Sequence, residues 1–278
     1  MPNTNNTLVL LRGGGDLASG VALRLHRAGI KVVITELPEP LAVRRTVSFS
    51  EAVYEGRHSV EAVNARLIEP DQLSDALEAN EIPVLVDPDA DILTDSRISH
   101  YQFPVVVDAR LIKTRPQPLP VNVSLHIGLG PGFYAGQDCQ AVIETRRSHT
   151  LGRVYWTGTT QPDSGEPEGD RRRVLRAPSD GVVVTHAQIG EHVDEAQLIA
   201  IISDQFSVIS PFKGILRGLI RPGLLVTRGL KIGDIDPRDD PSSCYLVSDK
   251  ALAIGGGVLE AILSRGDIRE KLWASSQP

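Results

Sequence analysis

Three consecutive glycines near the start of the chain carry the clearest chemical signal. Gly13, Gly14 and Gly15 open the pattern G-x-G-x-x-A, in which backbone N–H groups approach a pyrophosphate at a helix N-terminus. An apolar strand, Leu8 to Leu11, precedes the turn, and a helical pattern from Asp16 to Ala28 follows it. This context predicts a nucleotide site, with a tight turn that holds no ligand as the alternative.

Two carboxylates stand close to this turn in the sequence. Glu36 ends the β-branched run Lys31 to Thr35, about 20 residues after the glycines, where an acid can bind ribose hydroxyls. Asp16 follows the glycines directly and would hold a negative charge near a phosphate. It is interpreted either as an N-cap carboxylate or as a contact to a hydroxyl, amino group or cation of a ligand other than NAD.

Basic residues follow later strand ends. Arg44 and Arg45 come after the second strand, where guanidinium groups can hold phosphate through paired hydrogen bonds. The alternative for both is surface ion pairing with nearby glutamates. A further strand end carries three more candidate ligand contacts: Asp108, Arg110 and Lys113.

The turn from Gly128 to Gly136 is the second glycine-rich segment of this half. Gly130 and Gly132 are candidate cofactor contacts, and the aromatic residues Phe133 and Tyr134 could close over a flat pterin or purine. A tight turn packed by its own aromatic rings is the alternative. Cys139, just beyond, is interpreted as a small buried hydrophobe in preference to a thiolate that carries sulfur or selenium. No catalytic residue is assigned.

The elements that must position these residues alternate between strand and helix. After the first strand and helix, the pattern predicts a helix near 71–79 and strands near 31–35, 83–86, 104–107 and 121–128. Such alternation predicts an α/β fold with a Rossmann-like parallel sheet. The polar candidates follow the carboxyl ends of its strands, where ligands of such sheets bind.

The second half contains an internal repeat. Residues 33 apart match without a gap, as in Pro178 with Pro211 and Gly190 with Gly223. Two similar β-rich halves predict a smaller domain that resembles a biotinyl/lipoyl-type barrel-sandwich hybrid. The segment that joins the halves contains no lysine, and Lys213 lies beyond it, so we expect no covalent lipoyl or biotin.

These patterns divide the chain into four parts. We predict a nucleotide- or cofactor-binding domain at 1–156, a linker at 157–172, the barrel-sandwich hybrid at 173–238, and a helix at 239–278 that returns to the first domain. Gly255 to Gly257 are placed at the start of that helix, either for close helix packing or as a second anion site.

Composition limits the classes of protein. The net charge of -6 and the lack of a dominant basic patch exclude nucleic acid as the expected partner. The N-terminus lacks a signal-type apolar region and no stretch is long enough to span a bilayer, so we expect a cytoplasmic protein without a membrane partner. Two isolated cysteines and the histidine spacing predict neither a disulfide framework nor a metal site.

Four blocks together resemble one known family. They are Arg12 to Gly20, Val43 to Gly56, Val107 to Lys113 and Leu129 to Thr145, and the likeness extends through the repeat to the C-terminal helix. The chain resembles the YqeB family, accessory proteins of selenium-dependent molybdenum hydroxylases, and more distantly the xanthine dehydrogenase maturation factors. The resemblance implies a maturation role, in handling a molybdopterin cofactor or delivering selenium to it.

The expected function is therefore an accessory or maturation protein for a molybdenum hydroxylase, which is its expected partner. Its expected ligand is a nucleotide-bearing cofactor such as molybdopterin dinucleotide. Two alternatives stay open, an NAD(P)-dependent oxidoreductase and a docking scaffold without catalysis. The sequence predicts neither the oligomeric state nor whether the protein is an enzyme.

Overall fold

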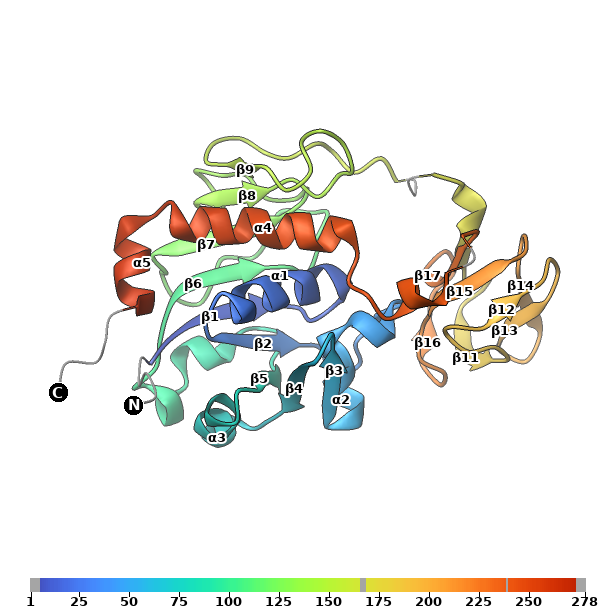
Figure 1. The fold of residues 1–278 in the computed structure, drawn as a ribbon, viewed down its shortest axis with the longest axis horizontal. Coiled ribbons are helices and arrows are strands. Elements are labelled where there is room, and N and C mark those ends of the chain that lie inside the picture. The colour runs from blue at the N-terminus through green and yellow to red at the C-terminus, as the bar shows by residue number, and fades with distance from the viewer. Residues whose placement is uncertain (1–5, 166–168, 239, 274–278) are drawn as a thin grey trace.

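The computed structural model describes residues 6–165, 169–238 and 240–273 of the chain. The ends of the predicted first and last parts, and three residues of the predicted linker, lie outside these ranges. Within them the strands form one nine-stranded sheet and two four-stranded sheets. Figure 1 shows the large sheet with its helices beside the smaller β-rich part.

The large sheet has the order β3-β4-β5-β2-β1-β6-β7-β8-β9. Its strands are β1 (Thr7–Arg12), β2 (Val32–Glu36), β3 (Arg57–Val60), β4 (Val63–Leu67), β5 (Ile82–Val86), β6 (Gln102–Asp108), β7 (Leu125–Leu129), β8 (Ala141–Ile143) and β9 (Val154–Tyr155). Neighbours from β4 to β8 pair in parallel, whereas β3 and β9 join the two edges antiparallel. The expected α/β class is therefore confirmed.

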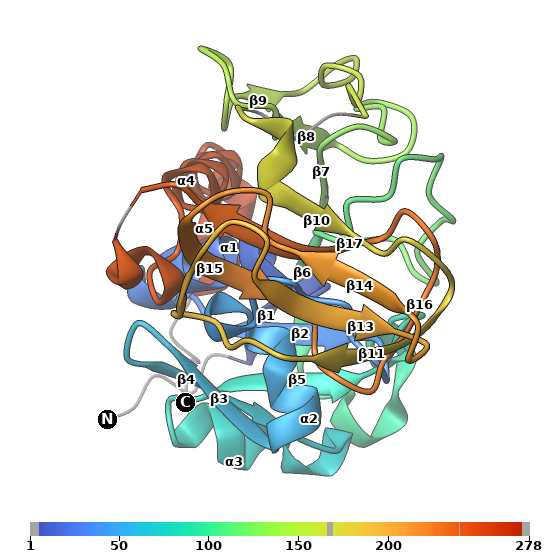
Figure 2. The same cartoon turned by 90° about the vertical axis from the view of Figure 1, so that its right-hand side faces the viewer.

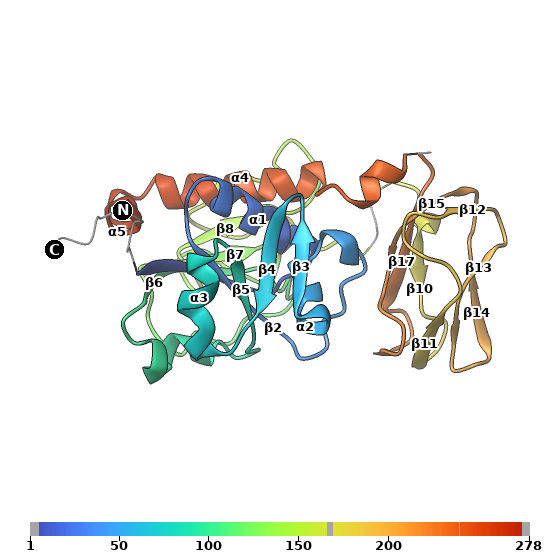
Figure 3. The ribbon, with the colours of Figure 1, turned by 60° about the horizontal axis from the view of Figure 1, so that its bottom comes forward.

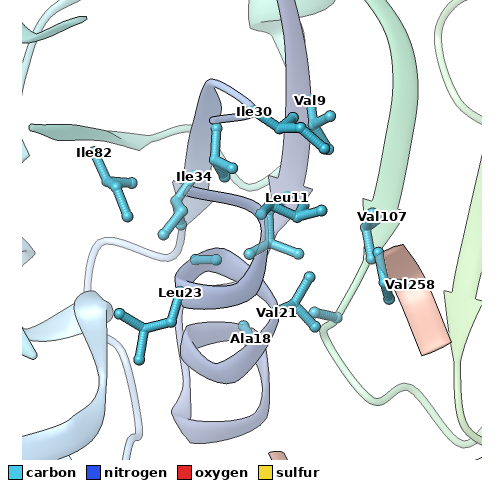
Figure 4. Close-up of a cluster of buried hydrophobic side chains, with 14 of the residues drawn as sticks. Val9, Leu11, Ala18, Val21, Leu23, Ile30, Ile34, Ile82, Val107 and Val258 are labelled. Atoms are coloured by element: carbon cyan, nitrogen blue, oxygen red, sulfur yellow. The ribbon is translucent and has the colours of Figure 1, made fainter. Parts of the chain in front are cut away.

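The helices cover both faces of this sheet. They are α1 (Asp16–Arg27), α2 (Ala52–Glu55), α3 (Leu73–Glu78), α4 (Asp249–Leu263) and α5 (Gly266–Trp273). In Figure 3, α1 and α4 lie on one side of the sheet and α3 on the other. Strand β1 is buried from both sides because Val9 and Leu11 join one apolar core while Leu8 and Leu10 join another. Figure 4 shows the first core, where Leu11 and Val21 meet between β1 and α1.

Helix α1 has the local signals of a helix that begins and ends where the sequence indicates. Asp16 lies in its first turn and Arg27 in its last, so each charge interacts favourably with the helix dipole. Gly29 adopts a φ of +80° directly after the helix, a conformation that glycine reaches without strain. The predicted helix over 16–28 is present nearly as expected.

The smaller part consists of two sheets of identical design. Its strands are β10 (Val174–Arg176), β11 (Gly181–Thr185), β12 (His192–Val193), β13 (Leu198–Ile202), β14 (Phe206–Ile209), β15 (Gly214–Leu219), β16 (Leu225–Val226) and β17 (Lys231–Asp236). One sheet has the order β10-β17-β15-β12 and the other β14-β13-β11-β16. A shift of 33 residues converts each strand of one sheet into the corresponding strand of the other, so the sequence repeat is a structural repeat.

The two small sheets differ in what they face. Strands β10 and β17 lie on the side toward the large sheet, and β13 and β14 lie on the far side (Figure 3). Figure 2 views the small part from that far side. Their apolar inner residues form a single core, separate from those of the large sheet.

Helix α4 begins earlier than the sequence analysis placed it. It starts at Asp249 and is capped by Ser248, so Gly255 to Gly257 lie in its interior and the proposed anion site at a glycine-rich N-terminus is wrong. The glycines serve close packing instead. A Cβ at Gly255 would lie 2.6 Å from the carbonyl oxygen of Gly20 on α1, and one at Gly257 would clash with the carbonyl oxygen of Gly152.

Adjacent glycines of α4 should therefore respond oppositely to alanine. Gly257→Ala is expected to lower the free energy of unfolding by about 1–3 kcal/mol because the methyl group overpacks the contact with Gly152. Gly256→Ala meets no atom within 4 Å and should raise it by about 0.5–1 kcal/mol through helix propensity. Urea unfolding followed by circular dichroism measures both, and equal effects would contradict the packing role.

Candidate functional site

The glycine turn lies at the point where the strand order reverses. The chain proceeds from β1 to β2, β4 and β5 on one side, and then crosses to β6 on the other side of β1. Ligands of open α/β sheets bind outside the carboxyl ends of the strands at such a point. Gly13 borders this crevice directly, since a Cβ there would lie 3.4 Å from the backbone of Ala109, which follows β6. In Figure 1 this edge of the sheet faces the small part.

Hydrogen bonds hold the turn from two sides. The N–H of Gly13 donates to the carbonyl oxygen of Thr35 at 2.7 Å, and that of Gly14 donates to Oε2 of Glu36 at 2.7 Å. The carbonyl oxygen of Gly14 in turn accepts from the N–H of Ser50 at 2.9 Å. The turn is therefore fixed by the end of β2 and by the segment before α2.

The N-terminus of α1 is open to a ligand. Gly15 occupies the N-cap position and no side chain caps the helix, so its first N–H groups have no helical partner. A Cβ at Gly15 would have no atom within 4 Å. Asp16 is the first residue of the helix, so its alternative as the N-cap is wrong. Its Oδ2 lies 3.5 Å from Nη1 of Arg44.

Both carboxylate oxygens of Glu36 already form hydrogen bonds within the protein. Its two carboxylate oxygens accept from the N–H groups of Gly14 and Leu37, each at 2.7 Å. Burial raises the pKa of Glu36, and these two hydrogen bonds act against that shift. Because each carboxylate oxygen has two lone pairs, a ribose hydroxyl can still bind there, and the ribose role stays a prediction.

Arg44 and Arg45 link the turn to distant parts of the chain. Arg44 is buried, and its Nη2 donates to the carbonyl oxygens of Ser243 and Leu246 at 2.9 Å each. Burial lowers the pKa of Arg44. Arg45 donates from Nε to the carbonyl oxygen of Leu219 on β15 at 2.7 Å. Both arginines therefore hold structure in place, and their predicted contact to phosphate stays a prediction.

Asp108 and Arg110 pair with each other at the end of β6. The carboxylate of Asp108 is fully buried and accepts from Nε and Nη2 of Arg110 at 2.9 and 2.6 Å. Nη1 of Arg12 lies 3.7 Å away, and Nη2 of Arg12 donates to the carbonyl oxygen of Pro88. This ion pair forms the β6 side of the crevice.

The remaining predicted contacts lie in structural settings of their own. Lys113 pairs with Asp163. Gly130 has a φ of +75° and a Cβ there would lie 2.7 Å from Oγ1 of Thr145, whereas one at Gly132 would clash with the carbonyl oxygen of Ile112. Phe133 is 1% exposed and packs edge-on against His126, which favours the tight turn over a loop that closes on a ligand.

A cavity of about 550 Å³ lies away from the glycine turn. It is lined by the segments that lead into β7 and β8, together with Trp156 and Arg265. His126 and Cys139 lie in its wall, and burial lowers the pKa of His126. Cys139 packs among Phe133, Ala135 and Val142 as a small hydrophobe.

Sequence reasoning missed the charged residues that the small part brings to this edge. Arg221 donates to Glu51 and Glu55 at 2.9 and 3.0 Å, and its guanidinium lies over the ring of Tyr54. Lys231 on β17 lies near enough to Asp16 for their charges to interact. No local motif marks these residues, because they are 170 or more positions from the turn in the chain.

The described residues contain neither a cluster of metal-binding side chains nor a membrane-spanning helix. The described residues contain no cluster of three or more histidine, cysteine, aspartate or glutamate side chains placed to hold a metal ion. No helix among them is long and apolar enough to cross a membrane.

The sequence was compared with known proteins. It is 44% identical over 272 residues to the uncharacterized protein YqeB of Escherichia coli (strain K12). Over the aligned residues the chain is similar to YqeB. The alignment covers 94% of this chain and 48% of YqeB, so the chain spans about half the length of that relative. The expected resemblance to YqeB is therefore found as sequence similarity, whereas membership of the YqeB family and the molybdenum role stay predictions. No protein-family profile matches the chain.

A comparison with solved structures gave only a distant likeness. The product-bound structure of the ectoine utilization protein EutE (DoeB) from Ruegeria pomeroyi matches with a TM-score of 0.23 and 10% identity. The match covers 83% of this chain and 57% of that protein. A TM-score this low carries no argument about fold or function.

The thiol of Cys139 should be unreactive in the folded protein. Burial raises its pKa to about 11, so little thiolate exists at pH 8. In a Cys244→Ser variant, where Cys139 is the single thiol, reaction with Ellman's reagent at pH 8 should be about a hundredfold slower in the native state than in urea. Equal rates would reveal an accessible thiolate and favour the sulfur- or selenium-carrying role.

Proposed function

We propose that the chain binds a nucleotide-bearing cofactor through its diphosphate at the turn Gly13 to Asp16. One observation carries the proposal: an uncapped helix N-terminus follows a glycine turn at the point where the strand order of the sheet reverses. N–H groups and the helix dipole there favour a bound anion. Glu36 at the end of β2 is the candidate contact for the ribose.

We also propose finer assignments for the two parts of the fold. Six of the seven parallel strands, β5-β2-β1-β6-β7-β8, follow the spatial order 3-2-1-4-5-6 when β4, which extends the sheet beside β5, is left out of the numbering. This order supports a Rossmann-like domain. The two repeated four-stranded sheets support a barrel-sandwich hybrid for the small part. In this assignment the hybrid is a structural or docking element without a modified lysine.

The resemblance to the YqeB family supports a role in the maturation of a selenium-dependent molybdenum hydroxylase. In that role the bound ligand is a pterin dinucleotide such as molybdopterin dinucleotide, and the molybdenum hydroxylase is the partner. The NAD(P)-dependent oxidoreductase is a second candidate, which the position of Glu36 after β2 favours equally.

The identity of the bound ligand distinguishes these functions. The protein is purified from its native host without denaturation, and the small molecules released by heat are identified by mass spectrometry. A pterin dinucleotide supports the maturation role, and a nicotinamide dinucleotide supports the oxidoreductase. Absence of any nucleotide, together with no thermal stabilisation by added nucleotides, contradicts both and favours the docking scaffold.

Gly15 is the most suitable position for testing the site, because an added Cβ there would contact no other part of the protein. Gly15→Val should lower the free energy of unfolding by no more than about 1 kcal/mol, because nothing lies within 4 Å of the new Cβ and only the N-cap preference for glycine is lost. It should nevertheless abolish nucleotide binding by blocking the approach of phosphate. Calorimetric titration of the folded variant measures this, and unchanged affinity would contradict the site.

Gly14→Ala provides the comparison. A Cβ there would lie 2.9 Å from the backbone nitrogen of Ser50, so this variant is expected to lose stability. Thermal unfolding of the two variants separates the packing glycine from the ligand-facing one.

A further inference from the structure

Because the small part contains a sequence repeat, the surface charges of its two sheets can be compared at equivalent positions. Leu216 and Ile235 belong to the apolar core, so their neighbours Arg217 and Asp234 face the opposite way, toward the large sheet. The repeat places Val184 and Ile201 at the equivalent positions of the far sheet. The fold thus accepts apolar residues there, and the charges are confined to the sheet that faces the glycine turn.

At two further pairs of equivalent positions, the near side again carries a charged residue and the far side an apolar one. Lys231 and Arg173 on the near side correspond to Leu198 and Phe206 on the far side. Phe206 is 45% exposed and Val184 is 41% exposed, so solvent contact alone does not require a charge at these positions. A requirement specific to the near side, where the glycine turn lies, accounts for the difference.

Asp234 organises the charged face. It is fully buried and accepts from Nε of Arg173 at 3.0 Å and from Nε of Arg217 at 2.9 Å. Nη1 of Arg217 also donates to Asp236 at 3.1 Å, and Asp236 pairs with Arg238. The arginines of this face are therefore held in place by buried carboxylates.

Lys231 differs from these arginines. Within the described ranges its amino group makes no hydrogen bond or ion pair, although it is half-buried and senses the charges of Asp16 and Asp234. Burial lowers the pKa of Lys231, and Arg173 and Arg217 lower it further. A nearby cation whose amino group is not used by the protein is available to a ligand.

The charges at this junction do not balance. Four cationic side chains (Arg44, Arg173, Arg217 and Lys231) meet two carboxylates (Asp16 and Asp234), whereas Asp236 is balanced by Arg238. Among these six groups about two positive charges are in excess, and Arg44 connects them to Asp16 in the first turn of α1. Arg44, 7% exposed, keeps an Nε without a hydrogen-bond partner in the described part of the chain.

We propose that Lys231 binds the diphosphate of the ligand held at the glycine turn, so that one anion site is built from both parts of the chain. This inference rests on the proposed function and adds its second half. The helix N-terminus supplies N–H donors from one side, and the amino group of Lys231 supplies a charge-assisted hydrogen bond from the other. If Lys231 served only to offset the charge of Asp16 across the interface, its removal would change stability and leave affinity unaltered.

The test is calorimetric titration of the full chain with ADP, CDP and pyrophosphate. Lys231→Met should weaken binding about tenfold or more, because a charge-assisted hydrogen bond is lost. Lys231→Arg should retain most of the affinity. The matched control is Lys213→Met. It removes an exposed lysine from the turn that precedes β15, a strand of the same sheet, and should change affinity less than twofold. Thermal unfolding of each variant verifies that it is folded.

The outcomes separate this inference from the proposed function. If the wild-type chain binds a diphosphate and Lys231→Met binds it within twofold as tightly, Lys231 is not a ligand contact while the nucleotide site stands. An equal loss in Lys213→Met also overturns the inference, since it reveals a general charge effect. If the wild-type chain binds none of the three probes and Gly15→Val behaves identically, both proposals fail.

Discussion

The hydrogen bonds around Gly14 are the constraint on which the rest of the site depends. Its N–H is taken by the carboxylate of Glu36 and its carbonyl oxygen by the N–H of Ser50, so the turn is fixed to β2 and to the segment before α2 at once. A side chain at Gly14 would break this contact because Ser50 is too close. The direction in which α1 leaves the sheet, and hence the position of its open N-terminus, follows from that junction.

The segment from Val43 to Glu55 carries this constraint to the small part. Arg45 donates to the backbone of β15, and Glu51 accepts from Arg221 while its carboxylate is 1% exposed. This pair is costly to break from the side of Glu51, because its buried carboxylate would remain desolvated without Arg221. The same short segment therefore supports the glycine turn on one side and orients the small part on the other.

The sequence predicted those features whose cause is local. Strand β1, the glycine turn and α1 combine apolar periodicity with helix-end signals, and the 33-residue repeat anticipated the paired small sheets. The hairpin of β3 and β4 was missed because Arg57–Val60 is short and largely polar. Gly255 to Gly257 were misplaced at a helix start, since only the contact with Gly20 and Gly152 reveals close packing. The position of Lys231, and with it the second half of the proposed anion site, depends on tertiary contacts and had no local signal.

The position of Asp16 explains why the glycine turn alone is an incomplete anion site. A carboxylate in the first turn of a helix stabilises that helix through its dipole, but it also repels a phosphate that approaches the same N–H groups. Arg44 lies 3.5 Å from Asp16 and offsets this repulsion, yet Arg44 is itself buried and bound to backbone carbonyls. The remaining positive charge must come from the sheet that faces the turn. In the proposed site a ligand would be stabilised fully only when both halves are in place, so its binding free energy would couple the small part to the large sheet.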